Sequence, residues 1–403
     1  MLNIALLGFG VVGSGAAEVI TENRDLLEKR LGTEVRIKYI LDLRDFPDSP
    51  FGNLIVHDFD TIINDPEVSI IAEMMGGSHP AYEFAKAALE RGKSVVTSNK
   101  ECVAKFGDEL LAIAAKNNCC YLFEASVGGG IPVIRPMMND LEPVRINEIS
   151  GILNGTTNYI LTKMLNEGAS FDETLADAQA KGYAERNPAA DVEGLDAARK
   201  IVILAALASG VLLDPDSICC EGITKITELD TQVAEKLGYA IKLIGYYTKT
   251  DDGKIICMVS PRFVPTNNPL STVNDVFNGI LVSSDMLGDT MFYGRGAGKL
   301  PTAGAVVADI LDIAAKGDRI KRLEWKRADE GDIADISEYV CRRVFTFEGE
   351  NLKDKVESVF GTLDNFFIDK DRISFVSLPM SEKEADEKTK KCELKLVSKY
   401  RTL

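Results

Sequence analysis

The sequence predicts an α/β protein with three parts: an N-terminal parallel sheet, a central α+β domain and a small C-terminal domain. Three observations predict this fold class. A strand-like segment at residues 2–7 runs into a G-x-G-x-x-G motif and then a helix. Strand-like and helix-like segments alternate up to about residue 130, which is typical of a parallel sheet. The predicted order near the C-terminus is β-α-β-β-α-β, the ferredoxin-like layout.

Length and composition narrow the classes of function. A chain of 403 residues exceeds one ordinary hydrophobic core, so two or three domains are expected. Its net charge of −16 argues against nucleic acid and anionic membranes as partners. The longest apolar stretch, residues 201–213, is too short to span a bilayer, and we expect no signal peptide. The eight cysteines include no C-x-x-C pair and are expected to be reduced, which predicts a cytoplasmic protein.

A dinucleotide-binding domain of the Rossmann type is predicted by the motif Gly8-Phe9-Gly10-Val11-Val12-Gly13. Gly8 allows a tight turn, Gly10 lets the backbone approach a pyrophosphate, and Gly13 lets the helix pack closely on the strand. The helix that follows, expected at residues 16–30, would direct its free N–H groups at the phosphates. The alternative is a glycine-rich turn in another α/β fold.

Two charged residues follow the second predicted strand, residues 35–41, and bear on the choice of cofactor. Asp42 stands where an acid would accept a hydrogen bond from the ribose 2′-OH of NAD, although later than the usual ~20 residues after the motif. Arg44 could instead meet the 2′-phosphate of NADP. The cofactor is therefore NAD or NADP, and Asp42 favours NAD.

Further candidate residues stand at the carboxyl ends of predicted parallel strands, where such sheets bind ligands. The strands are expected at 69–75, 94–98 and 119–126, with helices at 80–91 and 102–117. The strand-end residues are Gly76, Gly77, Ser98, Lys100 and Glu124. Lys100 is the cation among them, and a solvated loop lysine is its alternative interpretation.

The stretch from Gly182 to Lys200 gathers charged residues around a turn and the start of a helix. Asn187-Pro188 ends any preceding helix, and the apolar run at 201–207 predicts a buried one. Asp196 and Lys200 are four residues apart and share one helix face. A lysine held near carboxylates there is a candidate substrate clamp or proton donor. The alternative is a surface ion pair beside a core helix.

The central part predicts a mostly antiparallel sheet that could face a second subunit. Its strands are expected at 145–153, 240–248, 254–264, 279–284 and 291–293, and its helices at 131–141, 159–167 (capped by Thr156 or Thr157) and 171–181. The loop at 294–299, with Gly296 and Gly298, is either a second backbone approach to the cofactor or a flexible connection.

The remaining segments set the expected domain boundaries. An apolar helix at 301–317 returns to complete the first domain, and the charged segment after Gly317 is expected to be a linker. The tail is expected to hold strands at 338–347, 365–368, 373–378 and 393–398 and helices at 351–360 and 382–391. The predicted domains are therefore 1–130 for dinucleotide binding, 131–300 for catalysis and dimerisation, and 335–403 for the small tail domain.

The sequence resembles the homoserine dehydrogenase family over most of residues 1–317. The resemblance rests on ordered stretches, the last of them specific to the family: GFGVVGSG, AEMMGGSHPAYEFAKAALERGKSVVTSNKE, FEASVGGGIPVI, GILNGTTNYILTKM and AQAKGYAERNPAADVEGLDAARK. The tail resembles an ACT regulatory domain in layout only, because Glu348-Gly349-Glu350 replaces the usual Asp-x-Pro-Gly turn. No aspartate kinase segment is present, so the chain resembles a monofunctional member.

The resemblance implies reversible NAD(P)-dependent reduction of L-aspartate 4-semialdehyde to L-homoserine, a step of threonine and methionine biosynthesis. By position, Lys200 matches the lysine that exchanges a proton with the substrate oxygen, and Lys100 matches the lysine at the nicotinamide–substrate junction. The matching substrate-binding residues are Glu185, Asp191, Asp196 and Gly182. The resemblance also implies a structural sodium ion held by Glu124 and the backbone of Val127, Gly129 and Ile131.

The resemblance further implies a homodimer or homotetramer, and it makes threonine a candidate effector of the tail. Two other classes of function stay open on the residues alone. One is a dinucleotide sensor whose tail transmits amino-acid binding without catalysis. The other is a different Rossmann oxidoreductase, such as a sugar or imine reductase, although those commonly carry a catalytic His or Tyr where this chain offers lysines.

Overall fold

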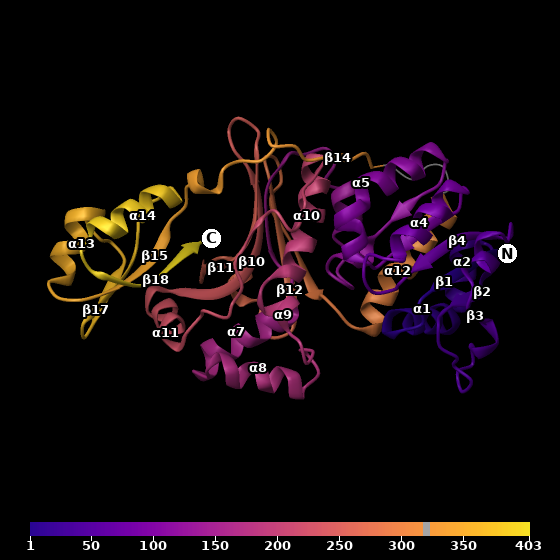
Figure 1. Cartoon of the computed structure of the whole chain (residues 1–403), viewed down its shortest axis with the longest axis horizontal. Helices are drawn as coiled ribbons and strands as arrows, with labels where there is room; N and C mark the ends of the chain where they lie inside the picture. The colour runs from indigo at the N-terminus through magenta and orange to yellow at the C-terminus, as the bar shows by residue number, and fades with distance from the viewer. Residues whose placement is uncertain (317–322) are drawn as a thin grey trace. The chain divides into compact units, whose positions relative to one another are not determined.

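The computed structural model describes residues 1–316 and 323–403, which form two compact units (Figure 1). Unit 1 comprises Met1–Ile146, Val202–Asp216 and Phe292–Ala328, and unit 2 comprises Asn147–Ile201, Ser217–Met291 and Asp329–Leu403. The three domain boundaries given above stay a prediction. The first part of the predicted linker, residues 317–322, lies outside the described residues. Within the described part of the chain, no helix has the length and apolar character needed to cross a membrane.

Unit 1 is built on a parallel sheet with the strand order β3-β2-β1-β4-β5-β6, as predicted for a Rossmann-type domain. The strands are β1 (Leu2–Leu7), β2 (Val35–Leu41), β3 (Ile55–Val56), β4 (Val68–Glu73), β5 (Ser94–Thr97) and β6 (Tyr121–Leu122). The strand order reverses between β1 and β4, which is the position where doubly wound sheets bind their ligands. Residues 4–7 of β1 are fully buried, as expected for a strand covered on both faces.

The helices of unit 1 cover this sheet. They are α1 (Val11–Glu22), α2 (Arg24–Leu31), α3 (Phe59–Ile63), α4 (Ala81–Glu90), α5 (Lys100–Lys116), α6 (Ile134–Asn139) and α12 (Lys299–Lys316), with short 3-10 turns η1 (Gly52–Leu54) and η2 (Glu124–Ser126). Late in the sequence, α12 returns to share one apolar core with β1 and α1. A Cβ on Gly15 of α1 would lie 2.9 Å from the Lys299 side chain, so glycine permits this close packing.

The helix predicted at residues 16–30 is wrong in its bounds. It begins at Val11, inside the glycine motif, and it breaks at Asn23 into α1 and α2. Asn23 leaves helical geometry (φ −102°, ψ 18°), and its side-chain amide donates to the carbonyl of Val19. Such local side-chain hydrogen bonds offer the backbone an alternative to the helix.

The larger sheet has the order β13-β12-β7-β10-β11-β18-β15-β17-β16, and β9 pairs with β11. Its strands are β7 (Ile146–Ile152), β9 (Cys219–Cys220), β10 (Tyr239–Lys249), β11 (Ile255–Pro265), β12 (Phe277–Ser284), β13 (Gly288–Arg295), β15 (Arg343–Glu348), β16 (Phe366–Asp369), β17 (Arg372–Val376) and β18 (Lys395–Thr402). As predicted, β10 and β11 form an antiparallel hairpin. The two-residue strands β8 (Val211–Leu212) and β14 (Lys326–Arg327) pair separately in unit 1.

The remaining helices are α7 (Gly155–Glu167), α8 (Phe171–Ala180), α9 (Ala189–Val192), α10 (Leu195–Ser209), α11 (Glu228–Leu237), α13 (Leu352–Phe360) and α14 (Glu382–Lys391), with 3-10 turns η3 (Pro269–Thr272) and η5 (Ile336–Glu338). The expected cap of α7 is wrong. Asn154, rather than Thr156 or Thr157, accepts the hydrogen bond from the backbone N–H of Thr157. Asparagine is among the most favourable residues at this position.

The C-terminal segment has the predicted ferredoxin-like layout. Its elements run β15-α13-β16-β17-α14-β18, and its neighbouring strands pair antiparallel in the order β18-β15-β17-β16. Four phenylalanine rings form the centre of its core: Phe345, Phe347, Phe360 and Phe375. Strand β18 also pairs parallel with β11, so this small sheet continues the larger one.

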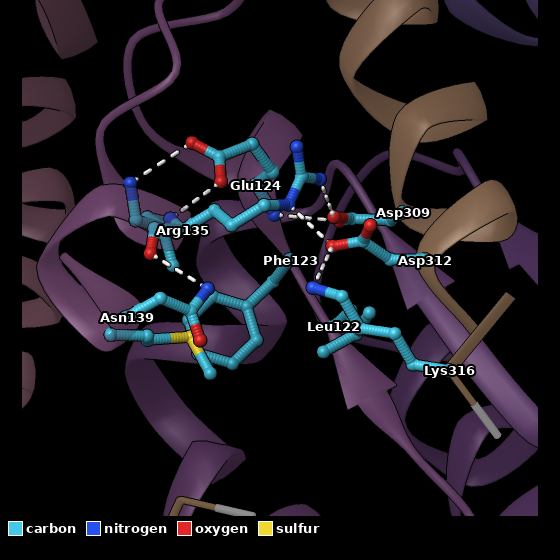
Figure 2. Close-up of a pocket in the computed structure, with 10 residues that line it drawn as sticks. Leu122, Phe123, Glu124, Arg135, Asn139, Asp309, Asp312 and Lys316 are labelled. Atoms are coloured by element: carbon cyan, nitrogen blue, oxygen red, sulfur yellow. Dashed lines mark hydrogen bonds and ion pairs between the residues drawn. The ribbon is translucent and has the colours of Figure 1, made fainter. Parts of the chain in front are cut away.

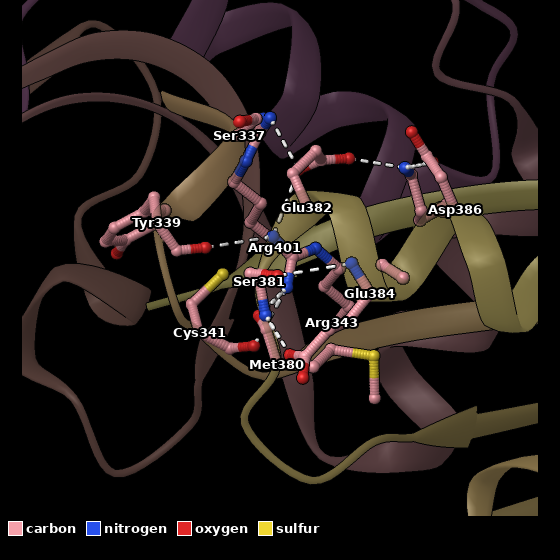
Figure 3. Close-up of polar contacts among 12 residues, drawn as sticks. Ser337, Tyr339, Cys341, Arg343, Met380, Ser381, Glu382, Glu384, Asp386 and Arg401 are labelled. Carbon is pink, nitrogen blue, oxygen red and sulfur yellow. Dashed lines mark hydrogen bonds and ion pairs between the residues drawn. The ribbon is translucent and has the colours of Figure 1, made fainter. Parts of the chain in front are cut away.

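Three arginines form a row across this junction. Arg262 of β11 lies opposite Arg401 of β18, which lies opposite Arg343 of β15, so all three stand on one face. All three are buried. Glu382, at the start of α14, accepts from Arg343 and Arg401 at 3.0 Å each (Figure 3). The Arg262 guanidinium instead stacks on the ring of Tyr246, 4.0 Å from its centroid.

Candidate active site

The glycine motif turns from β1 into α1 with the geometry that a pyrophosphate requires. Gly8 has a φ of +90°, which favours glycine, and a Cβ on Gly13 would lie 2.0 Å from the Gly8 carbonyl oxygen. Gly10 is exposed and faces open space, so a ligand can approach its backbone. Gly10 also caps α1 without a side chain, which leaves the first N–H groups of the helix to a ligand. These residues fit a bound dinucleotide.

Asp42 joins the end of β2 to the glycine motif. Its Oδ2 accepts from the Phe9 N–H at 2.9 Å, and its carboxylate is gripped by the Arg44 guanidinium at 3.0 and 3.1 Å. The Arg44 side chain holds the pKa of Asp42 down at about 2, with the Phe9 N–H contributing. Arg44 also lies over the ring of Phe46, 5.0 Å from its centroid. The acid and the base that were expected to compete for the cofactor thus pair with each other.

The strand-end residues lie at the carboxyl edge of the parallel sheet. Gly76 and Gly77 follow β4, and Ser98 follows β5. Lys100, expected in a loop, is the first residue of α5 and is half-buried. Asn99 caps this helix by accepting from the Cys102 N–H at 3.1 Å.

Two further glycine stretches pack against each other in unit 1. A Cβ on Gly129 would lie 2.6 Å from the backbone of Gly296, and the Gly130 N–H donates to the Arg295 carbonyl at 3.2 Å. Gly298, exposed with a φ of +123°, leads into α12. The loop at 294–299 is therefore packed closely against residues 128–130, and its approach to the cofactor stays a prediction.

The Glu124 carboxylate is buried and caps the start of α6 (Figure 2). Its oxygens accept from the backbone N–H groups of Val133, Ile134 and Arg135 at 2.7 to 2.9 Å. Burial raises the pKa of Glu124, although these hydrogen bonds and Arg135 oppose the shift. The Arg135 guanidinium binds Asp309 of α12 at 2.7 Å, and the Glu124 N–H donates to the same carboxylate at 2.8 Å. Burial and the charge of Glu124 raise the pKa of Asp309 to about 7.

The residues predicted to hold sodium offer the oxygen ligands that a hard cation prefers. The backbone carbonyls of Val127, Gly129 and Ile131 belong to buried residues, and they accept no hydrogen bond from the described residues. Buried carbonyls normally have a partner, so an external ligand would complete them. Oxygen atoms from carbonyls and one carboxylate are the ligands that such cations prefer.

Lys200 stands in a buried hydrogen-bonded cluster on α10. Its Nζ donates to Asp196 Oδ2 and to the Leu153 carbonyl, both at 2.7 Å, and 8% of the residue is exposed. The Asn154 amide donates to Asp196 at 2.9 Å and to Asp191 at 2.7 Å. The ion pair that could have been a surface contact is therefore buried, and it is joined to Leu153 and Asn154, which follow β7, and to Asp191 of α9.

Asn154 was not predicted as part of this cluster. Its position in the Asn154-Gly155-Thr156-Thr157-Asn158 run after a strand was the one available signal. Two residues that were predicted to bind the substrate, Glu185 and Gly182, form no hydrogen bond or ion pair with the described residues of the Lys200 cluster. Glu185 lies on an exposed turn, where its carbonyl accepts from the Gln179 side chain at 3.1 Å. Gly182 lies on the same turn with a φ of +73°. Lys100 belongs to unit 1 and Lys200 to unit 2, so their convergence stays a prediction.

Comparison with known proteins identifies the family. The homoserine dehydrogenase family model matches residues 132–311, and the model for the NAD-binding domain of homoserine dehydrogenase matches residues 8–124. The homoserine dehydrogenase of Neisseria gonorrhoeae is 43% identical over 319 residues, 78% of this chain and 72% of that one.

Solved structures agree with this result. A homoserine dehydrogenase from Thiobacillus denitrificans matches with a TM-score of 0.90 and 32% identity, over 100% of this chain and 98% of that one. A hyperthermophilic archaeal homoserine dehydrogenase in complex with NADPH matches with a TM-score of 0.68 and 28% identity, over 80% of this chain and 99% of that one. The chain belongs to the homoserine dehydrogenase family of NAD(P)-dependent oxidoreductases.

Proposed function

We propose that Lys200 donates the proton when aspartate 4-semialdehyde is reduced to homoserine. The nicotinamide, when bound, supplies the hydride, and negative charge then develops on the aldehyde oxygen. An ammonium group near this oxygen stabilises the charge and can donate the proton. The observation that carries the proposal is the bond from Lys200 Nζ to buried Asp196, which holds the ammonium in one orientation.

Lys100 is the second ammonium in this proposal, at the nicotinamide end of the site. Its place at the first turn of α5, beside the strand-end loops, supports this role. Glu185 and Asp196 are the carboxylates proposed to hold the substrate ammonium, and Asp191 and Gly182 are proposed as further substrate-binding residues. Asn154 keeps Asp191 and Asp196 together through its amide group. Glu185 has the freedom of an exposed turn, from which it can reach a bound substrate.

Removing Lys200 tests the assignment. Lys200→Ala and the bulkier Lys200→Met should lower turnover by about 10²- to 10⁴-fold, the usual contribution of a general acid. The dissociation constant of NADH or NADPH, measured by the quenching of protein fluorescence, should stay near the wild-type value. Lys236→Ala, which removes an exposed lysine of α11, is the control and should leave turnover unchanged. Near-normal turnover in Lys200→Met would contradict the proposal.

For the cofactor, we propose that Asp42 favours NAD over NADP. The support is the fixed position of its carboxylate against the Phe9 N–H, where a ribose hydroxyl would lie. Asp42→Asn keeps an acceptor for that N–H and should raise the KM for NADH more than the KM for NADPH. Arg44→Ala should have little effect on NADPH. A selective loss of NADPH activity in Arg44→Ala would instead assign Arg44 to a 2′-phosphate.

A sodium ion at Glu124 is the proposed structural metal. The support is the set of buried carbonyls at Val127, Gly129 and Ile131 that accept no hydrogen bond from the described residues. A sodium ion that binds the native state but not the unfolded state would raise the free energy of unfolding as the sodium concentration rises. The melting temperature should therefore be higher in sodium chloride than in choline chloride at equal ionic strength. Equal melting temperatures in the two salts would exclude the site.

The remaining proposals concern assembly, regulation and location. A homodimer or homotetramer is proposed from the resemblance and from the mostly antiparallel sheet, which could face a second subunit. Threonine as an effector of the C-terminal domain is proposed from the resemblance alone. Sedimentation velocity gives the assembly, and turnover measured with and without threonine gives the effector. A cytoplasmic location is proposed from the cysteines, which all lie in the described part of the chain and are free thiols.

A further inference from the structure

Glu73 is a buried carboxylate at the candidate cofactor site to which no role has been assigned. It is the last residue of β4, immediately before the loop that carries Gly76 and Gly77, and 1% of it is exposed. Among the described residues no lysine or arginine acts on its carboxylate, so it is buried without a cationic partner. Buried carboxylates are normally paired, and leaving one unpaired is unfavourable. Burial accordingly raises the pKa of Glu73 to about 7.

The Glu73 carboxylate connects two strand-end loops. Oε1 accepts from the backbone N–H of Met75 at 2.7 Å, which fixes the first turn after β4. Oε2 accepts from the Thr97 hydroxyl at 2.6 Å, at the end of β5. The Thr97 hydroxyl in turn accepts from the Asn99 N–H at 2.9 Å. One side chain therefore constrains the backbone after both strands.

The connection continues through Asn99 to the start of α5. The Asn99 amide donates to the Gly77 carbonyl at 2.7 Å and to the Met75 carbonyl at 3.4 Å, while its oxygen caps the helix. Lys100 is the next residue, so the direction in which it leaves the sheet depends on this network. Glu73 and Thr97 are each only 1% exposed, and hydrogen bonds are least weakened by water in such buried surroundings.

We propose that Glu73 is a positioning residue for the nicotinamide end of the site. It acts through Met75 on the Gly76-Gly77 loop and through Thr97 and Asn99 on Lys100. The inference rests on the proposed roles of this loop and of Lys100. If this position only had to be filled, an apolar side chain would serve better, because burying a carboxyl group costs free energy that an apolar residue of similar size does not. The hydrogen bonds from Met75, in the loop after β4, and from Thr97, at the end of β5, account for the carboxylate.

The test compares Glu73→Gln with two substitutions of Thr97. Glu73→Gln keeps the shape but replaces one acceptor oxygen with an NH2 group. Thr97→Val removes the hydroxyl, and Thr97→Ser retains it. Glu73→Gln and Thr97→Val should each lower kcat by about 10-fold or more, since small misplacements at a reacting centre have large effects. The KM for aspartate semialdehyde should change less than threefold, and Thr97→Ser should stay close to wild type.

The double variant separates positioning from simple packing. Because both residues act through one network, Glu73→Gln with Thr97→Val should lower kcat no further than the more severe single variant. Additive losses, or wild-type kcat in a folded Glu73→Gln, would overturn the proposal. If Glu73→Gln does not fold, the contrast between Thr97→Val and Thr97→Ser decides, and equal kcat values in these two overturn it.

Two parallel measurements keep this test apart from the proposed function. Lys100→Ala should abolish most turnover, and Lys105→Ala, on the same helix, should not. If Lys100→Ala retains turnover, the role of Lys100 is wrong. If Lys100→Ala is inactive while Glu73→Gln is fully active, only the positioning role is wrong. The dissociation constant of the nicotinamide cofactor should rise in Glu73→Gln, since the Gly76-Gly77 loop is held by the same carboxylate.

Discussion

A methyl group added at Gly13 should destabilise unit 1 before any cofactor is bound. Gly13 is buried in the first turn of α1, and a Cβ there would lie 2.0 Å from the carbonyl oxygen of Gly8 and 3.0 Å from its carbon. Contacts between carbon and oxygen normally exceed about 3 Å, so the backbone must move by about 1 Å. The obstacle is backbone, and rotation of a side chain cannot relieve it.

The magnitude follows from the surroundings of Gly8. Its own Cβ position lies 3.0 Å from the Met74 carbonyl oxygen, so backbone atoms also crowd Gly8 there. Overpacking of this kind costs about 1–3 kcal/mol, and sometimes more. The better helix propensity of alanine offsets at most about 1 kcal/mol of that. We expect Gly13→Ala to lower the free energy of unfolding by about 2 kcal/mol.

The measurement is urea unfolding of the cofactor-free protein, with Gly10→Ala as the matched control. Gly10 has a φ of −77°, and no atom lies within 4 Å of its Cβ position. Gly10→Ala should therefore unfold within about 1 kcal/mol of wild type, because alanine tolerates this φ and the change restricts the unfolded chain, which offsets part of the loss of a better helix cap. Its cofactor affinity should nevertheless fall, since the methyl group projects where the pyrophosphate is expected. Wild-type stability of Gly13→Ala would refute the reasoning.

Three further outcomes are expected. Glu382→Gln should lower the free energy of unfolding at pH 7 by about 3 kcal/mol, because it leaves buried Arg343 and Arg401 without their shared carboxylate. Desolvation opposes ionisation, but these cations and a neighbouring lysine lower the pKa of Glu382 to about 2. This stabilisation should therefore disappear as pH falls from about 4.5 toward 2, which urea titrations of variant and wild type can follow. Burial lowers the pKa of Lys242 from 10.5 to about 8. Its folded form thus binds fewer protons than its unfolded form between these values, so stability should rise with pH there, by up to about 3 kcal/mol. Lys242→Met should remove that rise, which melting temperatures measured over a series of pH values can follow. An unchanged dependence on pH in Lys242→Met would assign the rise to other groups. Asn154→Ala removes the cap of α7 and should lower the free energy of unfolding by about 1 kcal/mol. It should also lower kcat. A normal kcat in the folded variant would show that Asn154 serves only as a helix cap.

Local sequence signals determined much of the order of elements. The glycine motif between a strand and a helix predicted the Rossmann-type sheet, and the predicted order of segments in the tail matches β15 to β18. These signals are periodicity and turn residues, which operate over a few positions. Strands of two residues, such as β3, β8 and β9, carry no such pattern. They exist because a distant strand offers a free edge, and only the folded chain brings that edge to them.

For the candidate site as well, the sequence predicted some contacts and the tertiary structure decided the others. The spacing of Asp196 and Lys200 predicted their contact, because four residues make one turn of a helix. The same spacing occurs on protein surfaces, and only tertiary packing buried this pair and brought Asn154, the cap of α7, to it. Glu73 gave no signal at all, since a carboxylate near the end of a strand is ordinary in sequence. Its burial, and its bonds to two loops more than twenty residues apart, arise because parallel strands end side by side at one edge of the sheet.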